Sequence, residues 1–140
     1  MNKPPLWFFI VAVLALLWNA AGLMAVIGDL RLSASDIAAL PADQQALRAA
    51  VPGWSLAGSL LAVLGGTLGC LLLLLRKRWA LLAFLVSLAG VVLQDLGIFV
   101  VAGAGQSANP AIIVLQGLVA LVAIGLILLA RRAQGRAWIA

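Results

Sequence analysis

Gln94 and Asp95 stand side by side in a stretch that is otherwise almost entirely apolar from Trp79 to Ala104. A carboxylate in such surroundings is costly unless it meets a proton, a cation or hydrogen-bond donors, and such groups mark functional sites. The neighbouring amide can both donate and accept hydrogen bonds. The pair is therefore the first candidate for chemistry in this chain, as part of a solute site or of a proton- or cation-coupled site.

Further polar side chains interrupt the long apolar runs of the sequence, among them Asn19, Ser59 and Gln116. If each run is a helix that rises about 1.5 Å per residue, these three groups and the Gln94–Asp95 pair all lie roughly 20 to 24 Å from the more basic end. We predict a ligand-binding belt at this level, made of Asn19, Ser59, Gln94, Asp95 and Gln116. The alternative is that the amides only join neighbouring helices, at about 0.6–2 kcal/mol each, and that Asp95 is an interfacial residue.

Other kinds of chemistry lack the residues that they need. The chain has no histidine, no tyrosine and a single cysteine, Cys70, and its four acidic residues are all aspartates. Nucleophilic catalysis by a Ser-His or Cys-His pair needs a histidine, and a metal site needs several ligands at suitable spacing. We therefore predict that the protein is not an enzyme and has neither a metal site nor a cofactor.

The elements that must position these residues follow from the composition. Hydrophobic residues make up 66% of the 140 residues and charged residues 9%, whereas about a quarter of a soluble domain is charged. The apolar runs are continuous and about as long as the 20 residues that a helix needs to cross a bilayer. We predict an all-α, integral membrane four-helix bundle, a single domain over residues 1–140, with spans at about 6–27, 54–75, 79–101 and 111–130.

The charges predict how these spans are oriented. Seven of the nine basic residues fall at the N-terminus, between the second and third spans, or at the C-terminus: Lys3, Arg76, Lys77, Arg78, Arg131, Arg132 and Arg136. Basic residues are enriched on the cytoplasmic side of membrane proteins, so both termini are predicted to be cytoplasmic. Because this topology explains the net charge of +5, we expect no nucleic-acid partner.

The one sizeable predicted loop covers residues 28–53 on the outer side. Its residues Ile37, Leu40, Leu47 and Val51 fall on one side of a helical wheel, and Ser33 with Asp36 has the spacing of a capping box. Pro41 interrupts the pattern. We predict two short amphipathic helices that lie over the outer face of the bundle as a lid; the alternative is a plain tether.

Small residues recur along the second predicted span. Gly58, Ala62, Gly66 and Cys70 are each four residues apart, and Gly65 with Gly69 forms a GxxxG pair beside them. Such rows let helix backbones approach closely, so we predict helix packing through Gly58, Ala62, Gly65, Gly66 and Gly69. The row is also the candidate contact with a second copy or a larger membrane protein; packing inside one bundle is the alternative.

Several stretches of the sequence resemble a group of short bacterial four-helix inner-membrane proteins. They are "LWNAAG", "GGTLGCLLLLL" followed by "RKRWA", and "LPADQQALRAAVPGW". Most members of this group are uncharacterised and some are labelled sugar transporters, which implies a small polar solute. We predict an inner-membrane protein that binds or transports such a solute, as a homo-oligomer. The alternative is a non-enzymatic accessory or assembly subunit of a larger membrane complex.

Overall fold

The computed structural model describes residues 2–101, 103 and 110–140, and its regular elements are all helices. In chain order they are α1 (Leu6–Leu30), α2 (Ala34–Ala38), α3 (Ala42–Ala50), α4 (Gly53–Leu74), α5 (Trp79–Asp95), the π-helix η1 (Leu96–Val101) and α6 (Pro110–Gly135). The predicted all-α class is confirmed.

Four of these helical segments are long and apolar enough to cross a membrane: α1, α4, α5 continued by η1, and α6. Each coincides with a predicted span. α1 and α6 run further than predicted, to Leu30 and Gly135, because Asp29, Arg131 and the residues around them continue the helix beyond the apolar run. Helix formation does not require apolar residues, and arginine and glutamine are good helix formers.

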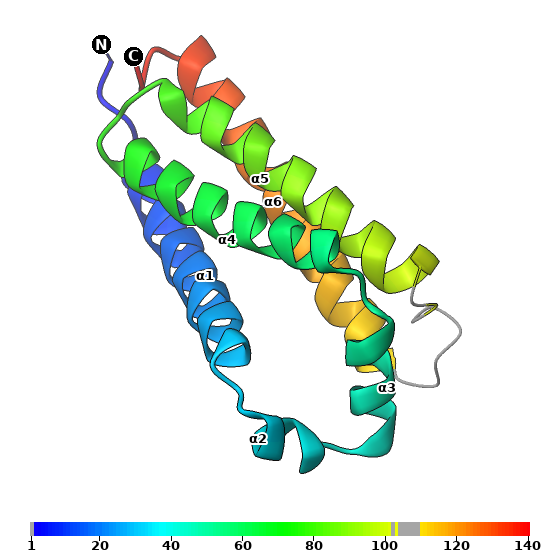
Figure 1. Ribbon diagram of the computed structural model, residues 1–140. Coiled ribbons are helices and arrows are strands. Elements are labelled where there is room, and N and C mark those ends of the chain that lie inside the picture. The colour runs from blue at the N-terminus through cyan, green and yellow to red at the C-terminus, as the bar shows by residue number, and fades with distance from the viewer. Residues whose placement is uncertain (1, 102, 104–109) are drawn as a thin grey trace.

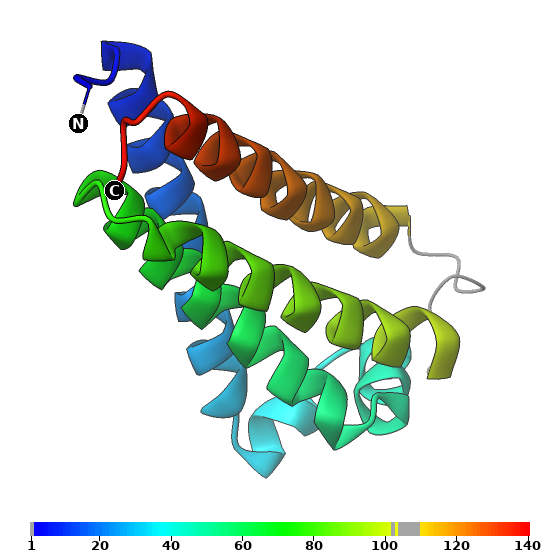
Figure 2. The same ribbon diagram turned by 90° about the horizontal axis from the view of Figure 1, so that it is seen from above.

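The long helices pack in the order α1, α4, α5, α6, with the closest association between α4 and α5. Both chain ends lie at one end of the molecule, and α2 and α3 lie at the other (Figure 1). The outer pair, α1 and α6, come together near the chain ends and diverge toward the opposite end (Figure 2). The assembly is therefore closed at the end with the termini and splayed at the other.

The main hydrophobic core occupies the closed end. Phe8, Leu73, Phe84 and Ala130 are buried there, one from each long helix. Trp138 follows α6 and packs edge-on against the rings of Trp7 and Phe8, with centroids 5.6 Å apart in both cases. The second core cluster, nearer the splayed end, has much smaller members: Ala62, Val91 and Ala123.

Glycines set the close approach of α4 and α5. A Cβ atom added to Gly58 would lie 2.7 Å from the backbone oxygen of Gly90, and one added to Gly65 would lie 3.0 Å from the backbone oxygen of Ala83. Real Cβ atoms essentially never come within 3.0 Å of another atom, and a contact at 3.0 Å is already tighter than most. A side chain at Gly58 would therefore force the two helices apart, and one at Gly65 would require a small shift.

The remaining small residues of α4 also face neighbours within the protein. A Cβ atom on Gly66 would collide with the amide of Asn19, and one on Gly69 would press on the ring of Phe84. Ala62 is buried. The small-residue row is therefore internal packing, and our expectation that it forms the contact with a second copy is wrong, because the row is already covered by α1 and α5.

The lid, residues 31–52, contains two short helices, as predicted from Pro41. Ser33 and Asp36 form the capping box: the Ser33 hydroxyl accepts from the Asp36 amide at 3.1 Å, and the Asp36 carboxylate accepts from the Ser33 amide at 3.0 Å. The four apolar lid residues named above are half-buried. Arg48 ties α3 to the end of α1 through a salt bridge to Asp29 at 2.6 Å, and this hydrogen bond raises the pKa of Arg48.

Candidate solute-binding site

A cavity of about 340 Å³ lies between the long helices where α1 and α6 diverge. All four long helices contribute to its wall, with most of the lining from α1 and α6. The walls come apart here because the core side chains at this level are small: Ala62 on α4, Val91 on α5 and Ala123 on α6. The volume falls within the range of about 300–1,000 Å³ that is typical of small-molecule pockets.

Four polar side chains line this cavity: Asn19, Ser87, Gln94 and Gln116. Two of them are engaged within the protein. The Ser87 hydroxyl donates to the backbone oxygen of Ala62 at 2.7 Å. The Asn19 amide donates to the backbone oxygen of Ala15 at 2.9 Å and to the sulfur of Cys70 at 3.7 Å. These two residues chiefly fix the wall of the cavity.

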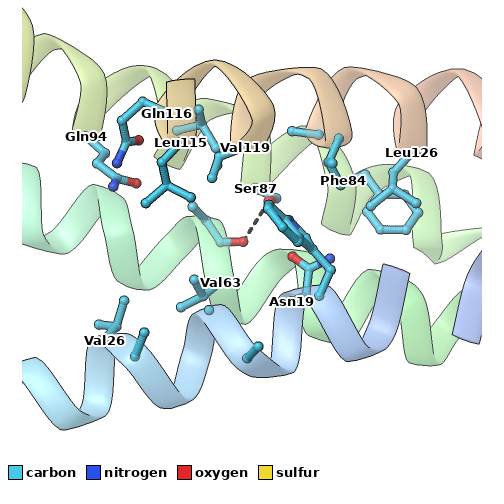
Figure 3. Close-up of a pocket in the computed structure, with 18 residues that line it drawn as sticks. Asn19, Val26, Val63, Phe84, Ser87, Gln94, Leu115, Gln116, Val119 and Leu126 are labelled. Atoms are coloured by element: carbon cyan, nitrogen blue, oxygen red, sulfur yellow. Dashed lines mark hydrogen bonds between the residues drawn. The ribbon is translucent and has the colours of Figure 1, made fainter. Parts of the chain in front are cut away.

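The side-chain amides of Gln94 and Gln116 are different, because neither forms a hydrogen bond with another described residue. They come from α5 and α6 and lie close together at one end of the cavity, whereas Asn19 and Ser87 lie further along it (Figure 3). Each amide offers two donor hydrogens and an acceptor oxygen. This end of the cavity can therefore bind hydroxyl or amide groups of a ligand, while the rest of the wall is apolar.

Asp95 does not line this cavity. Its carboxylate faces a separate shallow hollow between the α5–η1 segment and α6, which it shares with Phe99, Ile113 and Gln116. Of the two neighbours that we expected for Asp95, Gln116 shares this hollow and Asn19 does not. The reason is that Asp95 is one residue beyond Gln94 and is turned about 100° around the helix. Gln116 lines both spaces and lies between them.

The hollow contains two buried acceptor oxygens, Oδ1 of Asp95 and Oε1 of Gln116, and neither accepts a hydrogen bond from the described residues. Buried polar atoms are normally paired. This hollow can therefore take up a proton or a hydrogen-bond donor group of a ligand. Arg48 of the lid pairs with Asp29 and not with Asp95.

Ser59 also lies apart from the other members of the predicted belt. Its hydroxyl donates to the backbone oxygen of Ser55 at 3.3 Å, within its own helix. It borders a groove of about 490 Å³ under the lid, together with Asp29, Arg48 and Leu47. The prediction of one belt is corrected to one cavity with Asn19, Gln94 and Gln116, one hollow with Asp95, and one lid groove with Ser59.

A change of helix type accompanies Gln94 and Asp95. The α-helical winding of α5 ends at Asp95 and continues as the π-helix η1. At the junction, the Ser55 hydroxyl of α4 donates to the backbone oxygen of Gln94 at 3.0 Å. Short π-helical segments occur often at functional sites, and this one begins directly after the two polar residues.

Sequence reasoning missed the apolar part of the wall, for example Trp18, Val122 and Leu126. Their residue types carry no signal, because apolar side chains at a cavity look the same in a sequence as apolar side chains that face lipid. Among the described residues, no group of three or more histidine, cysteine, aspartate or glutamate side chains could hold a metal ion. No known protein family, curated protein or solved structure matches this chain.

Proposed function

We propose that this protein is a small polytopic protein of the bacterial inner membrane that binds, and allows the passage of, a small solute with hydroxyl or amide groups on a partly apolar body. The observation that carries the proposal is the cavity between the four long helices, with the unpaired amides of Gln94 and Gln116 at one end. We propose binding and not catalysis, because the described residues that line the cavity include no nucleophile with a base beside it.

The composition of the wall refines the solute class that the sequence suggested. Eighteen residues line the cavity, and all except the four polar ones are apolar, glycine or Trp18. A fully polar solute would leave most of its hydrogen-bonding groups unsatisfied against this wall, at a cost of about 1–3 kcal/mol for each group. A solute with a polar head and a short apolar part fits both regions of the cavity.

The proposed orientation places both termini in the cytoplasm and the lid outside, because the seven basic residues at the closed end obey the positive-inside rule. The test is thiol labelling of intact cells with a membrane-impermeant maleimide. Gln44→Cys in the lid should react in intact cells, and Lys77→Cys should react only after lysis. The parent protein is the control, since Cys70 is buried. Labelling of Lys77→Cys alone in intact cells would reverse the topology.

The binding proposal is tested by thermal unfolding of the purified protein in phosphatidylcholine nanodiscs. The probes are monosaccharides and their short alkyl glycosides. A ligand at about 100 times its Kd stabilises the folded state by about 2.7 kcal/mol, so the melting temperature should rise, and more with the alkyl glycoside than with the sugar alone. If no probe raises it and a larger membrane protein co-purifies in mild detergent, the accessory-subunit alternative is correct. Size measurements on the same sample test the proposed homo-oligomer.

A further inference from the structure

A second groove runs between α1 and α6, on the closed half of the molecule. It has a volume of about 600 Å³ and is lined by four residues of α1 and six of α6. Nine of these ten residues are apolar or glycine, and the tenth, at the end nearest the chain termini, is Arg132. Leu14 and Leu128 are about 60% exposed along this groove, so a ligand can enter it from the side.

The position of Arg132 is fixed by an aromatic ring. Its guanidinium carbon lies 5.9 Å from the centroid of the Trp7 ring, a cation–π distance, and Trp7 is in turn packed against Trp138. Within the described part of the chain, the Arg132 guanidinium has no carboxylate partner, because the one salt bridge found there joins Arg48 to Asp29. The guanidinium can therefore donate its hydrogen bonds to a ligand.

The surroundings of Arg132 favour an anion. Seven basic residues belong to the chain ends and the α4–α5 turn, at the closed end. The four aspartates belong to the end of α1, to α2, to α3 and to the end of α5, which lie toward the splayed end (Figure 1). Val122 and Arg132 are ten residue steps apart on α6, so the groove follows about 15 Å of helix between them. That length is about half of a hydrocarbon core of roughly 30 Å, which is the depth of one leaflet.

We propose that the groove between α1 and α6 is a binding site for an anionic phospholipid of the leaflet on the terminal side, with its phosphate on Arg132 and one acyl chain along the groove. Arginine binds phosphate by charge-assisted, often bidentate hydrogen bonds. The groove shares Trp18, Val122 and Leu126 with the cavity, so the bound chain also forms part of the lateral wall of the cavity. This inference does not rest on the proposed function.

The test is native mass spectrometry of the full-length protein released from vesicles with equal amounts of phosphatidylglycerol and phosphatidylcholine. The parent should retain phosphatidylglycerol in preference to phosphatidylcholine. Arg132→Gln should retain it roughly tenfold less, as expected for the loss of a hydrogen bond between charged groups. Arg131→Gln is the matched control, because it removes the same charge from a neighbouring residue that does not line the groove. A parent without preference, or an equal loss in both variants, would contradict the proposal.

A separate variant tests whether an acyl chain lies along the groove. A Cβ atom added to Gly125 meets nothing within 4 Å, so Gly125→Leu should fold normally and fill the groove. It should lose bound lipid of either headgroup, whereas Gly117→Leu, on the same helix but outside the groove, should retain it. Unchanged retention by Gly125→Leu would overturn the proposal. Displacement of the lipid by inorganic phosphate alone would also overturn the proposal. A dimer of the protein without bound lipid, in place of the lipid complex, would overturn it as well.

Discussion

Single glycines determine how closely α4 and α5 pack. We predict that Gly58→Ala destabilises the protein by about 1–3 kcal/mol, the usual cost of forcing an extra methyl group into a packed contact. The reason is that the new Cβ would lie 2.7 Å from a backbone oxygen of Gly90, which is not free to rotate away. The measurement is the urea or thermal unfolding midpoint in detergent.

The matched control for this prediction is Gly117→Ala on α6, where an added Cβ atom meets nothing within 4 Å. In a helix interior, alanine is favoured over glycine by about 0.5–1 kcal/mol, so this variant should be equally stable or more stable. Equal effects of the two substitutions would mean that α4 and α5 do not cross at Gly58.

Asp95 is the other residue with a sharp expectation. Its Oδ1 atom and the Oε1 atom of Gln116 are buried acceptors without a described donor. Asp95→Asn supplies two amide hydrogens and removes the charge, so we predict a more stable protein, by roughly 1 kcal/mol for one new hydrogen bond. Asp43→Asn on the exposed surface of α3 is the control and should change little. A variant that fails to fold would show that the carboxylate holds a cation or a donor.

At the scale of the elements, the lid depends on the capping box of α2. Two hydrogen bonds with Ser33 lower the pKa of Asp36 below its ordinary value of 3.8. The larger effect comes from the Ser33 backbone amide and the smaller one from the Ser33 side chain. Because the folded-state pKa is the lower one, the stabilising contribution is full above the ordinary pKa and is lost as the pH falls through the folded-state pKa. We predict that the capping box at the start of α2 is intact at neutral pH and is lost only in strong acid.

The Ser33 amide resonance, followed by NMR between pH 7 and pH 2, reports this titration directly, because that amide is bonded to the carboxylate at 3.0 Å. The midpoint should lie below 3.8, and in Ser33→Ala it should rise, since the hydroxyl bond is lost. A midpoint at or above the ordinary value in the parent would mean that the capping box does not form in solution.

The elements show what a sequence of this kind can and cannot predict. Hydropathy predicts the four long helices and Pro41 predicts the break between α2 and α3, because these are local properties. The π-helix after Asp95 has no local signal: the segment Leu96–Val101 lacks proline, and its winding is set by contacts such as the bond from Ser55 to Gln94. The positions of Asp95 and Ser59, in separate spaces, likewise depend on how whole helices rotate against one another.

At the scale of the whole molecule, a closed end and a splayed end explain where the cavity is. Large side chains such as Phe8, Phe84 and Trp138 fill the closed end, whereas alanines and a valine form the core beside the cavity. Lengths and charges predict the number and order of the spans. They do not predict this taper, because it arises from the pairing of side chains that are far apart in the sequence.

The central claim is that the unpaired amides of Gln94 and Gln116 bind a solute in the cavity. The most direct measurement is the Kd of the best-stabilising alkyl glycoside, determined by calorimetry in nanodiscs for the parent, Gln94→Leu, Gln116→Leu and Gln44→Leu. Each cavity variant should bind about tenfold more weakly, since one hydrogen bond of roughly 1.4 kcal/mol is lost. The lid variant Gln44→Leu should bind as the parent does. Equal affinity in all four proteins would contradict the claim.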